Sequence, residues 1–401
     1  MKIILCGDGN GAHVFSCLSA QQADVSVCIL SLYKPVREKW QQSMKEGAVL
    51  TVDCRNLDGT ETSISGNPTC ITDDPATAME GVSIAVFMNP AFTHNEYLKQ
   101  LEPFVQAGLI LVALPGQTGF EYAVRKIWKE KRKDVNIIAF ESLPWACKMS
   151  NIGKKAAIFG FKEVLEGGPM QISLDNQATE EAVATLQRCL GPVPVLKINH
   201  YTCGMSLNTL NAILHPSLMY GQWFGWDGKP ISEMPRFYFD ANKLGIQVME
   251  DVSNEIGSIC NAIAKEFPEL NLKSVDPIFR FLLRVYNDQI KDKKSLYTAV
   301  RSNTAYQEIM HPLKETEPGF FVPDFGSRYL TEDIPFGMIP LRGMAVLMNV
   351  NTPAMDKVIE WAQDVTGKEY LVNGALAGKD LWETSCPQSC GVTLPSQLFG
   401  C

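Results

Sequence analysis

Short apolar runs alternate with amphipathic stretches in the first part of the chain. The apolar runs, which we expect to form buried strands, are residues 2–6, 25–30, 49–52, 84–88, 109–114 and 135–140. Stretches with helical spacing, such as residues 96–105 and 121–129, lie between them. Strands that are apolar throughout are typically buried on both faces, and their alternation with helices requires right-handed crossovers. The pattern therefore predicts a parallel α/β sheet.

Two turn signals interrupt this pattern. Asp58 and Gly59 lie between residues 49–54 and 61–64, and an Asp-Gly pair favours the tight turn of a β-hairpin. We expect this hairpin to be inserted in the sheet. A further turn is expected at residues 167–169, which read Gly-Gly-Pro.

The periodicity becomes mostly helical from about residue 200. Apolar positions recur at helical spacing in residues 207–214, 248–267, 277–285 and 353–365. A chain of 401 residues is also longer than one ordinary core, because domains are commonly about 100–200 residues long. The sequence predicts an α/β fold: a sheet domain over residues 1–200, followed by an α-helical domain over residues 201–401.

Composition and charge exclude several classes of protein. Apolar residues make up 46% of the chain and charged residues 20%, an ordinary globular balance that argues against intrinsic disorder. There are 36 Lys and Arg against 44 Asp and Glu, and the net charge of −8 argues against nucleic acid or an anionic membrane as the main partner. No apolar run approaches the roughly 20 residues that span a bilayer.

The twelve cysteines form no recognisable framework. No Cys-x-x-Cys pair occurs, and Cys386, Cys390 and Cys401 make no plausible zinc set, so we expect no metal. The N-terminus lacks the apolar core of a signal peptide, so none is expected. These features predict reduced thiols in a cytoplasmic protein.

A glycine pattern carries the first chemical signal. Gly7-x-Gly9-x-x-Ala12 follows a predicted strand and precedes a helical stretch. Gly7 permits a tight turn, Gly9 lets the backbone approach a pyrophosphate, and Ala12 lets the helix pack closely on the sheet. With Asn10 and Gly11 these residues predict a dinucleotide-binding loop. The alternative is a glycine-rich turn that binds nothing.

One feature of such sites is missing. The second strand of a dinucleotide-binding domain usually ends on an Asp or Glu that binds the adenosine ribose, but here Ser31-Leu-Tyr33-Lys34 follows the strand. Ser31 could bond a hydroxyl, whereas Lys34 or Arg37 could meet a 2′-phosphate. We assign Tyr33 and Lys34 to the cofactor site, and the residues alone leave NAD and NADP both open.

Polar residues follow the later strands. Asn89 comes after the fourth apolar run, Gln117 after the fifth, and Glu141-Ser142 after the sixth. Ligands of open α/β sheets bind beyond the carboxyl ends of the strands, so these residues are candidates for binding the coenzyme or a small oxygen-rich substrate. The alternative is that they cap helices and satisfy loop backbone.

Histidine and arginine supply the remaining candidates. The five histidines are His13, His94, His200, His215 and His311, and spacing alone favours a structural role for each. His215-Pro216 ends an apolar helical run and precedes an aromatic segment. Arg328 lies among carboxylates, an arrangement that suits either bidentate binding of a carboxylate or a surface ion-pair loop.

Taken in order, these segments resemble the opine dehydrogenases, in particular the invertebrate octopine, tauropine and alanopine group. The segments that carry the resemblance are residues 6–13, 89–92, 114–120, 140–147, 215–216, 225–230, 323–333 and 367–370. They run through almost the whole chain, and the two longest are specific to this group. The resemblance implies an N-terminal Rossmann domain, a C-terminal helical domain and a site in the cleft.

The resemblance also implies an activity, the reductive condensation of pyruvate with an amino acid by NADH, which regenerates NAD⁺ in anaerobic glycolysis. The amine would attack the pyruvate carbonyl, water would leave, and the imine would accept a hydride. His215 matches the family's catalytic histidine, Asp333 the acid that orients it, and Arg328 a clamp for a substrate carboxylate. NAD is the cofactor that the family uses.

The substrate residues follow from the same resemblance. Gln117 and Ser142 match positions that line the keto-acid site, with Ser142 expected to replace a threonine and keep its hydroxyl. Residues 206–214 offer Thr209 and two asparagines but no carboxylate, which favours a small amino acid such as taurine, alanine or glycine. Arginine, received by Glu141, remains the alternative. The group also implies a monomer whose domains close on cofactor and substrates.

Two other classes of protein stay open on the sequence. One is a dehydrogenase of the glycerol-phosphate or ketopantoate type, whose phosphate substrate would call for a cluster of Lys and Arg. The other is a dinucleotide-binding protein without catalytic activity.

Overall fold

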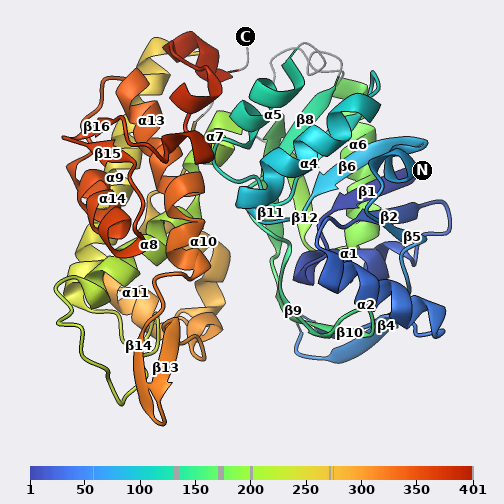
Figure 1. Cartoon of the computed structure of the whole chain (residues 1–401), viewed down its shortest axis with the longest axis horizontal. Helices are drawn as coiled ribbons and strands as arrows, with labels where there is room; N and C mark the ends of the chain where they lie inside the picture. Colours follow the sequence, from blue (N-terminus) through green and yellow to red (C-terminus); the bar gives the residue numbers. More distant parts are fainter. Residues whose placement is uncertain are drawn as a thin grey trace. The chain divides into compact units, whose positions relative to one another are not determined.

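The computed structural model describes residues 1–56, 58–129, 135–169, 176–198, 202–270, 272–273 and 275–399. The chain forms two compact units (Figure 1), one of Met1–Met205 with Phe399–Cys401 and one of Ser206–Leu398. The domain boundary that the sequence predicts, between residues 200 and 201, falls outside the described residues and stays a prediction.

The first unit is built on a mixed sheet with the strand order β12-β11-β8-β7-β6-β1-β2-β5. Its strands are β1 (Lys2–Cys6), β2 (Ser26–Leu30), β5 (Cys70–Thr72), β6 (Val82–Phe87), β7 (Ile110–Ala113), β8 (Asn136–Phe140), β11 (Val164–Pro169) and β12 (Val195–Ile198). The predicted parallel sheet is confirmed from β5 to β8, but β11 pairs antiparallel with β8. The prediction of a turn at residues 167–169 is therefore wrong. Gly167 lies in β11 opposite Phe140, and the absence of a Gly167 side chain leaves room for the Phe140 ring.

Helices cover both faces of this sheet, as the apolar runs predict. They are α1 (Asn10–Ser19), α2 (Lys34–Lys45), α3 (Pro75–Met79), α4 (His94–Leu101), α5 (Phe120–Trp128) and α6 (Asn176–Leu190). Ile3 and Leu5 of β1 join a core with α1 and α6, whereas Ile4 and Cys6 join a core with α3, α4 and α5. Alternate strand side chains point to opposite faces, so each face of β1 has its own core.

A second sheet, with the order β4-β3-β10-β9, corrects the position of the predicted hairpin. Its strands are β3 (Thr51–Arg55), β4 (Glu61–Ser65), β9 (Trp145–Asn151) and β10 (Lys155–Phe161). The hairpin of β3 and β4 forms here and not in the main sheet, although Leu57 in its turn lies outside the described residues. Only alternate residues of β3, Val52 and Cys54, are buried, which is typical of a sheet that is covered on one face.

The second unit is largely helical, as predicted. Its helices are α8 (Leu210–Trp223), α9 (Lys243–Glu266), α10 (Ile278–Tyr286), α11 (Leu296–Ser302), α12 (Arg328–Thr331), α13 (Ile339–Leu347) and α14 (Pro353–Thr366), and α7 (Thr202–Leu207) precedes them. Two short hairpins are formed by β13 (Leu313–Glu317) with β14 (Phe320–Pro323) and by β15 (Leu371–Val372) with β16 (Ala375–Leu376).

Shorter helical turns complete the two units. The 3₁₀ turns are η1 (Ala91–Thr93), η2 (Glu102–Phe104), η4 (Asn287–Gln289), η5 (Thr304–Tyr306), η7 (Leu381–Glu383), η8 (Gln388–Cys390) and η9 (Pro395–Phe399), and η6 (Ile334–Met338) is a π turn. Throughout the described part of the chain, no helix is both long and apolar enough to cross a membrane.

Helices α8 and α9 pack closely through glycine. A Cβ added at Gly221 of α8 would overlap the backbone of Gly245 in α9. Asn242, the N-cap of α9, donates a hydrogen bond to the Gly221 carbonyl at 2.6 Å and accepts one from the Gly245 amide at 2.9 Å. This crossing fixes α8, the helix that carries His215.

Candidate active site

The loop after β1 has the form that a dinucleotide needs. Gly7 has φ +107°, and a Cβ there would lie 2.8 Å from the Asn89 Cβ, so this position requires glycine. The chain then enters α1, whose N-cap, Gly9, makes no side-chain capping bond and has open space where a Cβ would lie. The amides of the first turn are therefore available to a phosphate.

Asn89 provides a further test of fit. It is buried beside Gly7, and its amide nitrogen donates a hydrogen bond to the Thr93 hydroxyl at 2.6 Å. Its Oδ1 is a buried acceptor without a hydrogen-bond partner in the described structure. Buried polar atoms are usually satisfied, so this orphaned oxygen fits a donor from a bound coenzyme.

The other predicted cofactor residues divide into buried and exposed groups. Ala12 is a buried residue of α1, and Asn10 accepts a hydrogen bond from the Met149 amide at 3.0 Å, which ties the start of this helix to β9. Tyr33 and Lys34 are exposed, and Lys34 lies 3.6 Å from Glu38. Asp8, which the glycine pattern treats as a variable position, bonds the Ser31 hydroxyl.

The predicted substrate residues follow the central strands β7 and β8. Gln117 lies just before α5 and accepts a backbone hydrogen bond from Phe120 at 3.0 Å. The Glu141 carboxylate accepts a hydrogen bond from the backbone amide of Glu166 in β11 at 3.3 Å. Ser142 meets a residue that sequence reasoning missed, since the Lys162 ammonium donates hydrogen bonds to the Ser142 hydroxyl and to the Leu143 carbonyl, the latter at 2.9 Å.

Lys162 has an unusual electrostatic setting. Burial lowers the pKa of Lys162 to about 8, and the nearby Glu141 opposes this shift. Lys162 follows β10 and lies near Glu141 and Ser142, but no motif marks a lysine in such a position, which explains why the sequence did not reveal it.

The second unit brings His215 and Asp333 together. The His215 Nδ1 and the Asp333 Oδ2 are 2.8 Å apart, although the residues are 118 positions apart in sequence. His215 lies inside α8 and not at the end of a helix as the sequence suggested, because Pro216 is accommodated within this helix. Burial raises the pKa of Asp333, and the hydrogen bond from His215 opposes this effect.

Aromatic side chains hold the imidazole. Tyr329 stacks on His215 with ring centroids 3.9 Å apart, and Phe237 meets its edge at 5.7 Å. The Tyr238 hydroxyl lies 3.0 Å from the His215 Nε2. Burial raises the pKa of Tyr238 well above its usual value, so its hydroxyl stays protonated and can donate to a neutral imidazole.

Arg328 and Thr209 lie in less constrained positions. Arg328 begins α12, its guanidinium donates a hydrogen bond to the buried Glu332 carboxylate, and its side chain is 63% exposed. Thr209 is the N-cap of α8 and makes no side-chain capping bond. The guanidinium therefore keeps donors at the surface, while Glu332 fixes its orientation.

Asp333 is positioned by an unusual backbone turn. It comes directly before the π turn of Ile334–Met338, and the Met338 amide donates to the Asp333 carbonyl at 2.9 Å, five residues apart. Such turns are rare and often occur at functional sites. No periodicity in the sequence marks this turn.

The remaining histidines fit the structural roles that spacing favours. His13 stacks on Trp40 at 3.6 Å and accepts a hydrogen bond from the Gly153 amide at 3.0 Å. His94 lies 3.1 Å from the Asn89 carbonyl, and His311 accepts from the Trp223 indole at 3.3 Å. His200 lies outside the described residues.

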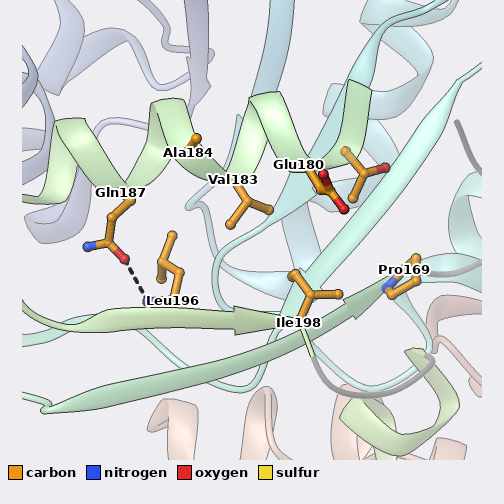
Figure 2. Close-up of a pocket in the computed structure, with 8 residues that line it drawn as sticks. Pro169, Glu180, Val183, Ala184, Gln187, Leu196 and Ile198 are labelled. Atoms are coloured by element: carbon orange, nitrogen blue, oxygen red, sulfur yellow. Dashed lines mark hydrogen bonds between the residues drawn. The ribbon is translucent and has the colours of Figure 1, made fainter. Parts of the chain in front are cut away.

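A pocket of about 440 Å³ lies between α6 and β12 (Figure 2). Val183, Leu196 and Ile198 make it largely apolar, and the Gln187 side chain accepts a hydrogen bond from the Leu196 amide at 2.8 Å. None of the predicted site residues lines this pocket. Among the residues that the structure describes, no group of His, Cys, Asp and Glu could hold a metal ion.

Comparison with known proteins adds full-length relatives. Residues 200–366 match the family model described as the α-helical domain of NAD/NADP octopine/nopaline dehydrogenase. The chain is 38% identical to octopine dehydrogenase of Pecten maximus over 401 residues, which cover 100% of this chain and 99% of the relative. It is 37% identical to tauropine dehydrogenase of Arabella iricolor, with 99% of each chain covered, and 39% identical to opine dehydrogenase of Haliotis discus hannai, with 99% of this chain and 98% of the relative covered.

Solved structures agree with these relatives. Octopine dehydrogenase with NADH and L-arginine matches with a TM-score of 0.91, and its complex with NADH and pyruvate matches with a TM-score of 0.89. Both are 37% identical and cover 100% of this chain and 98% of the solved chain. The predicted fold class and the predicted dehydrogenase activity are thereby confirmed. With relatives of this identity along its whole length, the chain belongs to the opine dehydrogenase family.

Proposed function

We propose that this protein condenses pyruvate reductively with an amino acid, using NADH. The observation that carries the proposal is the buried pair of His215 and Asp333, with His215 Nδ1 and Asp333 Oδ2 2.8 Å apart. A histidine whose Nδ1 is held by a carboxylate can take up and return a proton at Nε2. The solved relatives with NADH, L-arginine and pyruvate support the choice of substrates.

The coenzyme would bind along the loop of Gly7, Gly9, Asn10, Gly11 and Ala12. When bound, NADH supplies the hydride that reduces the imine formed from the two substrates. The amides at the start of α1 would bind its phosphates, and the orphaned Asn89 Oδ1 would accept from a polar hydrogen. Tyr33 and Lys34, exposed after β2, remain candidates for contact with its adenosine half.

His215 would move the proton that the condensation requires. As the amine attacks the pyruvate carbonyl, one of its protons is transferred to the carbonyl oxygen and a carbinolamine forms. A second proton from the same nitrogen then lets the hydroxyl group leave as water while the C=N bond of the imine forms. Nδ1 is held by Asp333, so the proton would move at Nε2, where Tyr238 also lies within 3.0 Å. The negative charge of Asp333 stabilises the imidazolium, and this electrostatic interaction is stronger because Asp333 is buried.

The substrate carboxylates need cations or donors. Arg328 is the proposed carboxylate clamp, because its planar guanidinium can bind a carboxylate through two donors. Gln117 and Ser142 are the proposed keto-acid residues, and Lys162 holds the Ser142 hydroxyl in place.

The amino acid is proposed to be small, such as taurine, alanine or glycine. Residues 206–214, with Thr209, carry no carboxylate for a guanidinium. Glu141 is the residue that would receive arginine if arginine is the substrate. We further propose that the protein acts as a monomer in the cytoplasm.

A three-way assay tests the function. NADH absorbance is followed with pyruvate alone, with each amino acid alone, and with both together. Oxidation of NADH only when both are present supports the proposal, whereas oxidation with a keto acid alone contradicts it. A panel of arginine, taurine, alanine, β-alanine and glycine identifies the substrate. If arginine is used, Glu141→Gln raises its KM much more than that of alanine.

A further inference from the structure

The carboxylate that is missing from the end of β2 is supplied by the neighbouring loop. β1 and β2 are parallel neighbours, with Cys6 opposite Leu30, so the residues that follow them lie at the same edge of the sheet. The fully buried Ser31 hydroxyl donates a hydrogen bond to the Asp8 Oδ2. An acid at this edge is what a dinucleotide-binding fold uses to bind the adenosine ribose.

The Asp8 carboxylate can accept more hydrogen bonds than those from the Ser31 hydroxyl and its own backbone amide. Ser31 is the one side chain bonded to it among the residues that the structure describes, which leaves Oδ1 without a side-chain partner. Asp8 itself is partly exposed. Its position between Gly7 and Gly9, beside the proposed pyrophosphate loop, lets a ligand reach this oxygen.

The cations at this edge are already engaged. The Arg37 guanidinium is buried, donates a hydrogen bond to the Ser31 carbonyl at 2.9 Å and pairs with Asp73 at 2.9 Å. Lys34 is exposed and lies near Glu38. The Arg37 charge already acts on Asp8 and pairs with Asp73, so a phosphate at this edge would meet two carboxylates and no unpaired buried cation.

We infer that Asp8 binds the hydroxyls of the adenosine ribose and makes the enzyme select NADH over NADPH. The inference rests on the proposed function only in that NADH is the coenzyme. A hydrogen bond to a charged group commonly contributes about tenfold or more in affinity. A 2′-phosphate would remove the ribose donor and place a second anion beside the carboxylate.

The Asp8→Asn variant tests the inference, because it keeps the shape of the side chain and removes its charge. We expect the Kd for NADH, measured by coenzyme fluorescence without substrates, to rise about tenfold or more. The Kd for NADPH should stay the same or fall. The ratio of the Kd for NADPH to the Kd for NADH should therefore drop by about tenfold or more. The ratio of kcat/KM with the two coenzymes should follow.

The matched control is Asp24→Asn, which makes the same change of charge just before β2, at the opposite end of this strand, where Asp24 pairs with Arg188 at the surface. It should leave both Kd values unchanged. Ser31→Ala keeps the carboxylate and should weaken NADH binding less than Asp8→Asn while keeping the preference. If Asp8→Asn does not fold by thermal denaturation, Asp8→Ser provides a second neutral side chain.

The outcomes separate this inference from the proposed function. A folded Asp8→Asn or Asp8→Ser protein with the preference of the wild type overturns the inference. So does a wild-type protein that binds NADPH as tightly as NADH. Wild-type protein that binds NADH selectively but never oxidises it with pyruvate and an amino acid contradicts the proposed condensation and leaves the role of Asp8 standing.

Discussion

The coenzyme loop and the His215–Asp333 pair are built in opposite ways. The loop uses consecutive residues after β1 and exposes backbone amides around Gly9, with glycine required at Gly7 by its positive φ. The pair joins residues 118 positions apart and holds them with aromatic rings. A site made of local backbone can be recognised from a short motif, whereas a site made of packed side chains depends on the whole helical unit.

The two regions also handle charge differently. The loop offers the partial positive charges of backbone amides next to the open space at Gly9. Asp333 is a carboxylate buried at 7% exposure, whose pKa is raised by that burial. The Asp333 charge therefore interacts more strongly with its neighbours than the amides of the loop do with theirs. Removing one partner of the His215–Asp333 pair should also cost more free energy.

The largest expected effect comes from removing the buried pair. His215→Ala should lower kcat about 10²–10⁴-fold, because the positioned proton donor and acceptor is lost. Asp333→Asn should lower kcat by a similar order, since the amide no longer fixes the tautomer or stabilises the imidazolium. The measurement is single-turnover oxidation of NADH with both substrates.

NADH affinity is the control for this prediction. Both variants should bind NADH as the wild type does, because the coenzyme loop belongs to the other unit. A His215→Ala protein that binds NADH and turns over at a near-normal rate would sink the assignment of His215.

Lys162 sharpens the comparison, because it is a partly buried charge within the first unit. Its pKa is about 8 in the folded protein and 10.5 ordinarily. Between these values the unfolded chain binds more protons, so wild-type stability gains with rising pH in this window. The stability of Lys162→Met relative to the wild type should therefore be highest below pH 8 and fall by about 3 kcal/mol towards pH 10.5. Denaturant unfolding of both proteins at several pH values measures this difference.

The control for Lys162 is Lys154→Met, which removes an exposed pair with Glu46. Its stability relative to the wild type should change by less than about 1 kcal/mol over the same pH range. Parallel pH curves for Lys162→Met and the wild type would show that Lys162 stays charged in the folded protein.

Two glycines of the loop should fail in different ways. Gly9→Ala adds a methyl group in open space, so the free protein should keep its melting temperature while NADH affinity drops about tenfold. Gly7→Ala places a Cβ against Asn89 at positive φ and should itself cost about 1–3 kcal/mol of stability. Thermal unfolding with and without NADH separates the two. Equal loss of stability in both variants would contradict the distinction.

The smallest expected effects concern the scaffold of His215. Gly221→Ala pushes α8 against Gly245 of α9 and should cost about 1–3 kcal/mol. Gly257 lies in α9, and nothing is near the methyl group that alanine would add there. Gly257→Ala should therefore stabilise the protein by about 0.5–1 kcal/mol. Chemical denaturation measures both, and a Gly221→Ala protein as stable as the wild type would show that the helices can separate at no cost.

Much of the first unit could be predicted from the sequence. The strands β1, β2, β6, β7 and β8 follow from apolar runs, because each is buried on both faces. The sequence predicts the hairpin of β3 and β4 but not the sheet that it joins. The alternating pattern of a strand covered on one face does not show which strand lies beside it. Residues 167–169 have the composition of a turn but belong to β11, where they pair with residues 138–140 of β8 and where Gly167 leaves room for the Phe140 ring.

The second unit was less accessible to sequence reasoning. The prediction that His215 lies beside Asp333 came from the family resemblance, since no local pattern joins α8 to the start of the π turn at Asp333. Tyr238 and Tyr329 were missed because aromatic residues in an apolar unit are ordinarily core. Asp8 was missed for a different reason, namely that the motif leaves the position between its glycines unspecified.

The π turn after Asp333 makes the number of residues in this segment important for the position of Asp333. Each residue of a helix turns the next by about 100°, and the turn at Ile334–Met338 holds one residue more than an α-helical turn would. Removing one residue between Arg328 and Ile339 would let the segment relax into an α-helix and rotate Asp333 away from α8. In evolutionary terms, the length of this segment is constrained as well as its side chains, so chimaeras between relatives have to keep the same number of residues here.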